Sequence, residues 1–316
     1  MNYCEMNLIF TNIKIFIMKK LILSVAMLCV TGIFYAQECA DCEVSQMTPT
    51  MMVQFENLSD VDQVGADNFA LVDQEGLGNY ARINQYGSNG HHAPGGLGNK
   101  GYVFQNGTGN NGIIDQAGDF NTGVIAQMGD DNYAEQEVGN GWAENNRAHS
   151  YQFGSDNVSY QDQFYDNNTA FVVQAGDSNY AEQFQSSSQA GAGNLAIIGQ
   201  TWYGNKAEQT QNGDNNTAIA LQVGVENSSV EDQTTVGGSA WNSSLVIQFG
   251  YQNESCVDQD ASGNGWNASH VFQEGAFNTS DVSQMAAAGG ANSSFVNQLG
   301  HANAACITQS APGVPN

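Results

Sequence analysis

The chain repeats one short pattern at a fixed spacing. Residues 63–85 contain it twice, as Gln-x-Gly-x-x-Asn-x-Ala-x-x-x-Gln, and the second copy begins 11 residues after the first. Counting from the Asn as position 0, a small residue stands at +2, Val or Ile often at +4, and Gln at +6. Strand side chains alternate with period two, so these positions share one face of a strand. The four residues between Gln and the next Asn, commonly with Gly second, predict a turn.

The pattern continues almost to the end of the chain. It gives 21 units, and 20 of them carry Gln at +6; the exception is the unit of Asn132, where +6 is Val138. A fixed period repeated this often is the signature of a solenoid or an array of stacked units. The Asn of each unit stands at positions 57, 68, 79, 99, 110, 121, 132, 146, 157, 168, 179, 194, 205, 216, 227, 242, 253, 267, 278, 292 and 303.

Composition favours an ordered and strongly acidic chain. Gln- and Asn-rich chains are either disordered or prone to β-aggregation, but here Val, Ile and Ala recur at regular positions, which favours order. After residue 36 the chain carries four Lys or Arg and 31 Asp or Glu, a net charge of −27. This charge argues against nucleic acid and against an anionic membrane as partners.

The amino-terminal region predicts export. Residues 18–36 are typical of a secretory signal peptide, with two lysines followed by an apolar run, and residues 1–17 form a possible over-extended start before Met18. A membrane anchor is the alternative, because the apolar region extends from residue 8 to residue 35, although lysines interrupt it. No second apolar segment follows, so we expect no stable membrane insertion after the signal is removed.

Residues 37–56 form a separate N-terminal segment in which Cys39 and Cys42 make a CxxC pair. A local disulfide and half of a metal site are both open, but a structural or incidental pair is favoured, because no second CxxC or spaced His pair accompanies it. The longest insertion between two units contains His91 and His92, and a solvated loop tip is favoured there over a metal site.

Alternate units differ at +4, and this difference predicts how the strands wind. Along one stretch, every second unit carries an amide or carboxyl group there, whereas the units between carry Ser, Val, Ile or Ala. If two strands make one winding, the polar residues stack in one column on one sheet, where amides one strand spacing apart can hydrogen-bond. We call this set the amide column; its residues are Gln136, Gln161, Gln183, Gln209 and Glu231.

The predicted fold is all-β, a parallel two-sheet β-solenoid over residues 57–309 with strand-turn-strand windings of about 22–25 residues, which becomes cross-β on polymerisation. The 21 strands give about ten windings, or about 50 Å of stack at about 4.8 Å per winding. Residues 310–316 form a C-terminal tail. Cys256 and Cys306 share the outward +3 position two windings apart, and about 9.5 Å is too far for a disulfide.

The sequence lacks the pattern of an enzyme. Many parallel β-helices are polysaccharide lyases, but those use basic catalytic residues, and this chain has four Lys or Arg after residue 36. Its five histidines are scattered, without the spacing of a nucleophile and a base. We therefore predict no enzymatic activity, no catalytic or metal site and no cofactor.

The repeated unit resembles the curlin repeat of curli fibre subunits, and the resemblance covers about residues 57–309. It implies a secreted structural subunit of a curli-like extracellular fibre, a functional amyloid of the biofilm matrix that serves surface adhesion. It also implies that the chain polymerises with itself at the cell surface, and that a curli-type secretion pore, a nucleator and a chaperone are its partners. Carried over to this sequence, the resemblance assigns ladder and self-assembly roles to Asn68, Gln74, Asn79, Gln85, Asn110, Gln116, Asn121, Gln127, Asn168, Gln174, Asn179, Gln185, Asn216, Gln222, Asn253, Gln259, Asn278, Gln284, Asn303 and Gln309.

Two other functions stay open, a minor subunit that nucleates the fibre and a monomeric β-solenoid adhesin. Exposed end strands favour polymerisation, because no capping element follows Gln309. Residues 37–56 differ from the Gly-rich pore-targeting segment of the curlin family, so the export route is not assigned. Outward Glu182 and Glu208 are expected one winding apart, where their repulsion opposes stacking.

Overall fold

The computed structural model describes residues 56–86, 96–140, 143–237 and 239–313. The predicted signal peptide, Cys39 and Cys42, and His91 and His92 lie outside these residues. Within them every regular element is a strand, and no helix there has the length and apolar character needed to cross a membrane.

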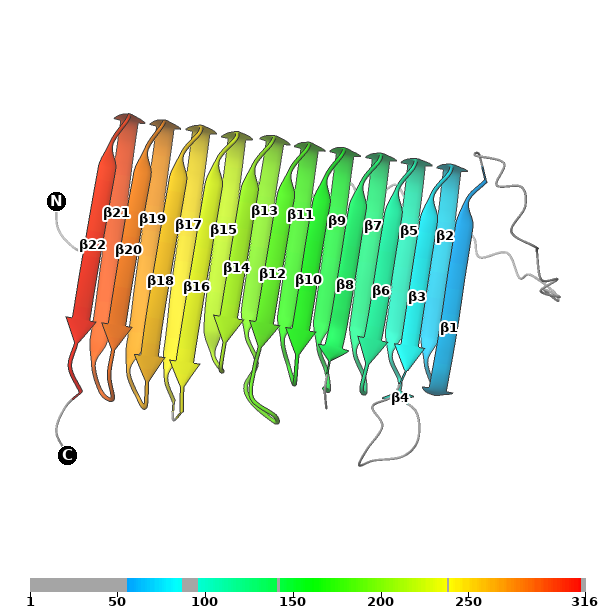
Figure 1. Ribbon diagram of the computed structural model, residues 1–316, viewed down its shortest axis with the longest axis horizontal. Helices are drawn as coiled ribbons and strands as arrows, with labels where there is room; N and C mark the ends of the chain where they lie inside the picture. Colours follow the sequence, from blue (N-terminus) through cyan, green and yellow to red (C-terminus); the bar gives the residue numbers. More distant parts are fainter. Residues whose placement is uncertain (1–55, 87–95, 141–142, 238, 314–316) are drawn as a thin grey trace, which may run out of the picture. The chain divides into compact units, whose positions relative to one another are not determined.

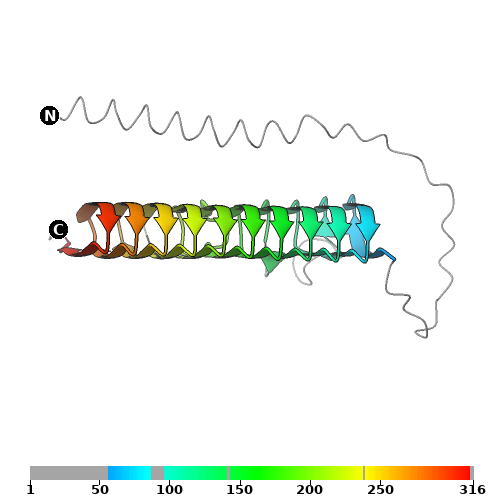
Figure 2. The same cartoon turned by 90° about the horizontal axis from the view of Figure 1, so that it is seen from above.

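The strands form two parallel sheets that the chain visits in turn, and Figure 2 shows these sheets as two layers. Sheet 1 contains β1 (Leu58–Ala66), β3 (Tyr80–Tyr86), β4 (Gly96–Leu97), β6 (Asn111–Ala117), β8 (Tyr133–Asn140), β10 (Val158–Phe164), β12 (Tyr180–Ser186), β14 (Lys206–Asn212), β16 (Ser228–Val236), β18 (Glu254–Ser262), β20 (Thr279–Ala286) and β22 (Ala304–Ala311). Sheet 2 contains β2 (Phe69–Leu77), β5 (Lys100–Thr108), β7 (Thr122–Asp130), β9 (Arg147–Ser155), β11 (Thr169–Asp177), β13 (Leu195–Tyr203), β15 (Asn216–Val225), β17 (Trp241–Tyr251), β19 (Trp266–Ala276) and β21 (Ala291–His301).

Successive windings pair in parallel and in register. For example, β11 pairs with β9 and β13, so that Gln152, Gln174 and Gln200 lie side by side. Equivalent residues of neighbouring windings are 22, 25 or 26 positions apart, and 31 apart across the insertion after β3. The predicted two-sheet parallel β-solenoid with two strands per winding is confirmed, with the longest windings exceeding the expected length.

A thin core lies between the sheets and is built from the +2 and +4 positions. Ala81 and Ile83 are fully buried, and the same alternation of a small and a β-branched residue recurs along the stack. Space is short at +2, because a Cβ on Gly101 would lie 2.6 Å from Cγ2 of Ile83. Three apolar clusters result, around Ile114, Val172 and Val246, and polar side chains fill the rest of the interior.

The segments that connect the two sheets, here called arcs, are of two kinds, and only one kind varies in length. From sheet 2 back to sheet 1, four residues always separate Gln at +6 from the next Asn, and Figure 1 shows these arcs as an even row along the top. All differences in length fall in the arcs from sheet 1 to sheet 2. One of these arcs holds the short β4, which pairs with Gly65 and Ala66 of β1.

A column of glycines at +8 explains the uniform arcs. Gly107 has a φ of 132°, and a Cβ there would lie 1.9 Å from the carbonyl oxygen of Gly129 in the next winding. The backbones therefore approach too closely for any side chain. Trp202 occupies the equivalent position of one winding with a φ of 85°. The glycines of the column are Gly76, Gly107, Gly129, Gly154, Gly176, Gly224, Gly250, Gly275 and Gly300.

In most units the residue before the ladder Asn has a left-handed backbone, which the sequence analysis did not predict. Twelve of these residues are not glycine and have a φ between 50° and 62°, whereas Trp241, Trp266 and Ala291, which begin strands, have no positive φ. Asp and Asn tolerate this conformation better than most residues, and they hold half of these positions. The residues are Asp67, Phe120, Asp131, Asn145, Asp156, Asn167, Ser178, Asn215, Glu226, Gln252, Phe277 and Ala302.

The glycine column predicts a strong contrast between two Gly→Ala substitutions. Gly107→Ala should lower the free energy of unfolding by about 3 kcal/mol or more, because it adds backbone strain to a clash with the next winding. Gly78→Ala, at a φ of 66° with open space around its Cβ, should cost about 1 kcal/mol. Urea denaturation of both variants measures the difference. Equal losses would show that the close approach of the arcs does not limit the fold.

Candidate functional site

Stacked glutamine side chains run along the whole of sheet 2. In each winding, Nε2 of the Gln at +6 donates a hydrogen bond to Oε1 of the equivalent Gln in the next winding, as at 2.9 Å between Gln174 and Gln200. After the first winding these side chains are buried, so the stack is one continuous ladder inside the protein. Its residues are Gln74, Gln105, Gln127, Gln152, Gln174, Gln200, Gln222, Gln248, Gln273 and Gln298.

The second hydrogen of each glutamine amide joins the two sheets. Nε2 of Gln174 also donates to the backbone oxygen of Val158, at 2.9 Å, and Nε2 of Gln185 donates to that of Thr169, at 3.1 Å. The acceptor is the residue at +1 of the preceding strand unit in the facing sheet throughout. A buried amide left without partners costs about 1–3 kcal/mol, so both bonds matter for stability. One side chain therefore aligns the windings and links the sheets.

Sheet 1 carries the same ladder with one interruption. It stops at Val138, whose side chain has no polar atom, and it resumes with Gln163 in the next winding. Within the described residues, Oε1 of Gln163 accordingly has no hydrogen-bond partner. The ladder consists of Gln63, Gln85 and Gln116 before the interruption and Gln163, Gln185, Gln211, Gln233, Gln259, Gln284 and Gln309 after it.

The amide column begins in the winding where the sheet 1 ladder is interrupted. Nε2 of Gln136 donates to Oε1 of Gln161 at 2.7 Å, and the stack continues at 2.9 to 3.0 Å through Gln183 and Gln209 to Glu231. Each of its glutamines also donates to a backbone oxygen of the facing sheet. The structure thus brings together, in the buried interior, the five residues that the sequence analysis placed in one column.

Glu231 ends the column with a fully buried carboxyl group. Its Oε1 accepts the hydrogen bond from Gln209, whereas Oε2 has no partner among the described residues, and the next residue along the stack is Val257. Burial raises the pKa of Glu231 to about 6, against weaker opposing effects of Gln209, the Ser244 hydroxyl and the Ile219 backbone. The folded chain therefore binds a proton here more tightly than the unfolded chain does.

Asparagine side chains form two further ladders at the starts of the strands. Oδ1 of Asn179 accepts hydrogen bonds from the backbone N–H of Asn205, at 3.1 Å, and from its Nδ2, at 3.0 Å. That Nδ2 also donates to the backbone oxygen of Gly224 in the arc. The sheet 1 ladder contains Asn57, Asn79, Asn110, Asn132, Asn157, Asn179, Asn205, Asn227, Asn253, Asn278 and Asn303. The sheet 2 ladder contains Asn68, Asn99, Asn121, Asn146, Asn168, Asn194, Asn216, Asn242, Asn267 and Asn292.

The ladders give the solenoid a direction. Glutamine amides donate toward the C-terminal end of the stack, so Gln309 presents an amide hydrogen there and Gln63 presents an oxygen at the opposite end. Asparagine side chains donate in the reverse sense, from Asn303 to Asn278 and onward to the first winding. The free donors of one end therefore match the free acceptors of the other end. Two identical ends would not match in this way.

The outward face of sheet 1 carries a patch of carboxylates. Glu182 and Glu208 lie in register one winding apart, as predicted. Burial, and then repulsion from Glu137, raises the pKa of Asp162 to about 7, and burial followed by neighbouring carboxylates also raises the pKa of Asp258. No group of three or more metal-ligating side chains within the described ranges has the geometry to hold a metal ion. The patch consists of Asp115, Glu135, Glu137, Asp162, Glu182, Glu208, Asp232, Asp258 and Asp281.

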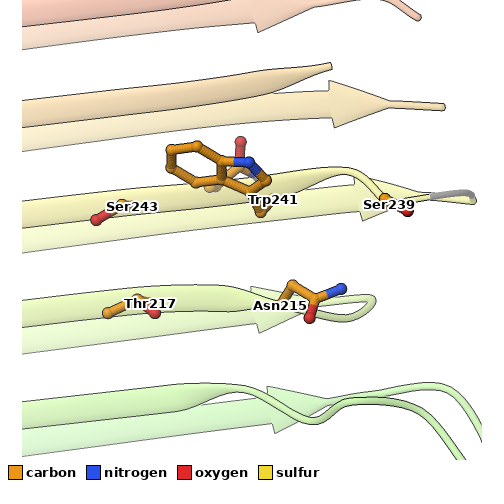
Figure 3. A pocket seen from close by; sticks show the side chains of 6 residues that line it. Asn215, Thr217, Ser239, Trp241 and Ser243 are labelled. Atoms are coloured by element: carbon orange, nitrogen blue, oxygen red, sulfur yellow. The ribbon is translucent and has the colours of Figure 1, made fainter. Parts of the chain in front are cut away.

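A shallow hollow of about 510 Å³ lies where β17 begins (Figure 3). The ring of Trp241 rises on the side away from Thr217 and Asn215 of the neighbouring winding, and it stacks on Trp266 at 5.0 Å between ring centroids. The residues that line the hollow are an indole, amides and hydroxyls, without an acid or base. This hollow therefore offers no proton donor or acceptor of the kind that general acid–base catalysis uses.

Cys256 and Cys306 have free, exposed thiols. Cys256 is in register with Asp281, and Asp281 is in register with Cys306, so two windings separate the cysteines as predicted. Partial burial, and then repulsion from Asp281 and other nearby carboxylates, raises the pKa of the Cys256 thiol.

The fold and its ladders define a class, the parallel β-solenoid repeat proteins whose windings are joined by stacked side-chain amides. Residues 56–87 match the family model of the curlin associated repeat. This segment covers β1 to β3 and so contains one complete winding, and the same spacing and contacts continue to β22. No curated protein gives a significant match to the chain.

Glu231 predicts a pH-dependent stability. Its folded pKa of about 6 lies above the ordinary value of 4.5, so its destabilising effect is absent below pH 4.5 and complete above pH 6. At pH 7.5, Glu231→Gln should therefore raise the free energy of unfolding by about 2 kcal/mol, and at pH 4 by little.

Denaturation at both pH values measures this effect. Glu182→Gln is the control, because it removes an outward carboxylate from the same sheet. If Glu231→Gln changes stability equally at pH 4 and pH 7.5, then folding does not raise the pKa of Glu231 above its value in the unfolded chain.

Proposed function

We propose that the chain is a secreted structural subunit of a curli-like extracellular amyloid fibre, which serves biofilm matrix and surface adhesion. The observation that carries the proposal is the complementarity of the two ends of the amide ladders. A second copy could stack with its β1 and β2 on β22 and β21 of the first copy. This would extend the Gln and Asn ladders of both sheets by one step. Gln309 of the first copy would donate to Gln63 of the second, and Asn57 of the second would donate to Asn303 of the first. Two like ends would place donor against donor in one pair of ladders and acceptor against acceptor in the other, so growth is head to tail.

The end strands also favour such a contact by their apolar residues. At one end Val61 is 46% exposed, and at the other Ile307 packs on the last apolar cluster from one side. In the interior of the stack the equivalent +4 residues, such as Ile83 and Val282, are fully buried. Four new amide pairs at about 0.5–1.5 kcal/mol each add to this burial at every junction. The exposed edges supply the backbone groups for further strand pairing.

Charge opposes the same assembly and so keeps copies apart before they meet a fibre end. The carboxylate patch repeats along sheet 1, and the chain after residue 36 has a net charge of −27. Raised pKa values at Asp162, Asp232 and Glu231 mean that the folded stack binds protons more tightly than the unfolded chain. Mild acid and added salt therefore favour the stacked form.

Export through a curli-type secretion pore, with a chaperone and a nucleator, belongs to the same proposal and rests on the likeness of the repeat. A minor nucleating subunit shares the solenoid and both of its ends, so it is the second candidate. A monomeric adhesin is less well supported, because both outer windings leave their ladders open in the described structure.

Substituting the end face tests the proposal. Ile307→Lys places a charge at the inward +4 position of β22, where a following copy would seat, and it should reduce fibre elongation at least tenfold. Cys306→Lys adds the same charge to the outward face of the same strand, and it should leave elongation nearly unchanged. Dye-binding kinetics measure elongation, and X-ray diffraction of the fibres should show a reflection near 4.8 Å along the fibre axis.

Two results would contradict the proposal. One is a purified chain that stays monomeric at pH 5 in the presence of preformed fibre seeds. The other is an equal elongation rate for Ile307→Lys and Cys306→Lys, which would mean that the end windings do not form the junction.

A further inference from the structure

The outward faces of the two sheets have opposite chemical character. The +3 and +5 positions from β6 to β20 of sheet 1 carry the carboxylate patch described above. The same two rows from β5 to β19 of sheet 2 contain no Asp, Glu, Lys or Arg. We call these sixteen positions the apolar face; they are Tyr102, Phe104, Val124, Ala126, His149, Tyr151, Phe171, Val173, Ile197, Gly199, Ile219, Leu221, Leu245, Ile247, His270 and Phe272.

Several strands of sheet 2, such as β11, β13 and β15, have the composition of strands that are covered on both sides. The segment β15 reads NTAIALQVGV, with Ile219 and Leu221 pointing outward and Ala220 and Gln222 inward. Parallel strands with near-continuous apolar runs normally have both faces buried. In sheet 1, β14 reads KAEQTQN and alternates between buried and polar outward residues, as expected for a face in water.

The side chains of the apolar face remain partly exposed in a single solenoid. Ile197, Ile219 and Leu245 stack on one another along the +3 row, and each keeps part of its surface accessible. Gly199 interrupts the +5 row between Val173 and Leu221, and Cδ2 of Leu221 packs over it, 3.0 Å from where a Cβ would lie.

We propose that the apolar face is a docking surface for the apolar face of a second copy of this chain, so that two solenoids pair side by side. Figure 2 shows the sheets as two layers, so each sheet has one face directed away from the other. Eight strands at about 4.8 Å and seven residues at about 3.3 Å give the whole outward face of sheet 2 an area of about 900 Å², of which the apolar face is about half. The whole outward face, with Lys100, Arg147 and Glu274 beside the apolar rows, is comparable to the roughly 800 Å² per partner of a standard stable interface.

Two properties of the face select a second copy over another occupant. The first is its period, because side chains that repeat at every winding over eight windings interdigitate in register with a surface of the same repeat, and another copy has that repeat. The second is charge, because pairing through sheet 2 directs the two carboxylate patches away from each other. Pairing through sheet 1 would instead bring Glu182 and Glu208 against the same acids of the partner. The pairing does not depend on head-to-tail stacking, since it uses a different face.

A matched pair of substitutions tests the pairing. Ile219→Glu places a charge at +3 of β15 in the apolar face, and Val230→Glu places the same charge at +3 of β16, on the outward face of sheet 1. Ile219→Thr, which keeps a β-branched side chain, serves as a second variant that preserves strand preference. Circular dichroism of all three proteins checks that the strands are retained.

Mass per unit length, measured by scanning transmission electron microscopy, gives the number of solenoids side by side in a fibre. We expect fibres of wild type and Val230→Glu to have twice the mass per length of one stack. Fibres of Ile219→Glu should have the mass per length of a single stack. Ile219→Thr should give a mixture. In soluble protein, sedimentation velocity should show a dimer for wild type and Val230→Glu and a monomer for Ile219→Glu, which tests pairing even if the chain forms no fibres.

Three results would overturn the proposal. The first is a wild-type chain that is a monomer in sedimentation velocity and forms fibres with the mass per length of one stack. The second is an equal mass per length for fibres of Ile219→Glu and Val230→Glu. The third is a single wild-type stack that binds microcrystalline cellulose or phosphatidylcholine vesicles in a way that Ile219→Glu abolishes, because the occupant would then be a polysaccharide or a lipid surface.

Discussion

The stacked primary amide is the interaction on which the rest of this structure depends. A carboxamide carries two donors and an acceptor on one rigid plane, so a stack of them can satisfy every member from its neighbours alone. In this chain one hydrogen of each ladder Gln continues the stack and the other reaches the facing sheet, as Gln174 does to Gln200 and Val158. Most of the buried amides are thereby satisfied within the protein, which removes much of the usual cost of burying polar groups, and Oε1 of Gln163 and Oε2 of Glu231 are exceptions.

This arrangement separates the positions that fix the fold from those that are free to change. The inward rows at 0, +2, +4 and +6 and the glycine column at +8 are constrained by contacts along the stack. The outward rows and the arcs from sheet 1 to sheet 2 are not, and there the chain varies in charge, in aromatic content and in length. Surface properties such as the carboxylate patch and the apolar face can therefore differ between the two sheets while the winding stays the same.

Much of the fold could be predicted from the sequence, because a period of 11 residues with alternating inward positions leaves few architectures. The amide column was predictable for the same reason, since Gln161 and Gln183 recur in alternate units and two strands per winding places them together. Three features were not predictable from the pattern. The left-handed residue before most of the ladder Asn residues varies in type, as Asp67 and Phe277 show, and its conformation is imposed by the arc. The bond from each Gln to the facing sheet requires the distance between sheets. The partial exposure of the apolar face depends on how its side chains pack along the rows.

The interruption at Val138 shows how the ladder tolerates an error. Losing one amide leaves Oε1 of Gln163 without a partner in the described structure, a cost of about 1–3 kcal/mol. The winding persists because the Asn ladder passes through Asn132 unbroken and because the amide column starts at Gln136 in the same strand. Parallel ladders therefore share the alignment of the windings, and none of them acts alone.

Side-chain amide hydrogen exchange tests the central role of the ladders most directly. If the stacked amides hold the windings together, the Nε2 hydrogens of Gln174 and Gln200 should exchange at least about a thousandfold more slowly than the Nδ2 hydrogens of outward, exposed Asn297, corresponding to an opening free energy of about 4 kcal/mol. Nuclear magnetic resonance of the selectively labelled chain resolves these groups. Exchange of Gln174 and Gln200 within tenfold of the rate of Asn297 would contradict the account, because the ladder would then be open to water.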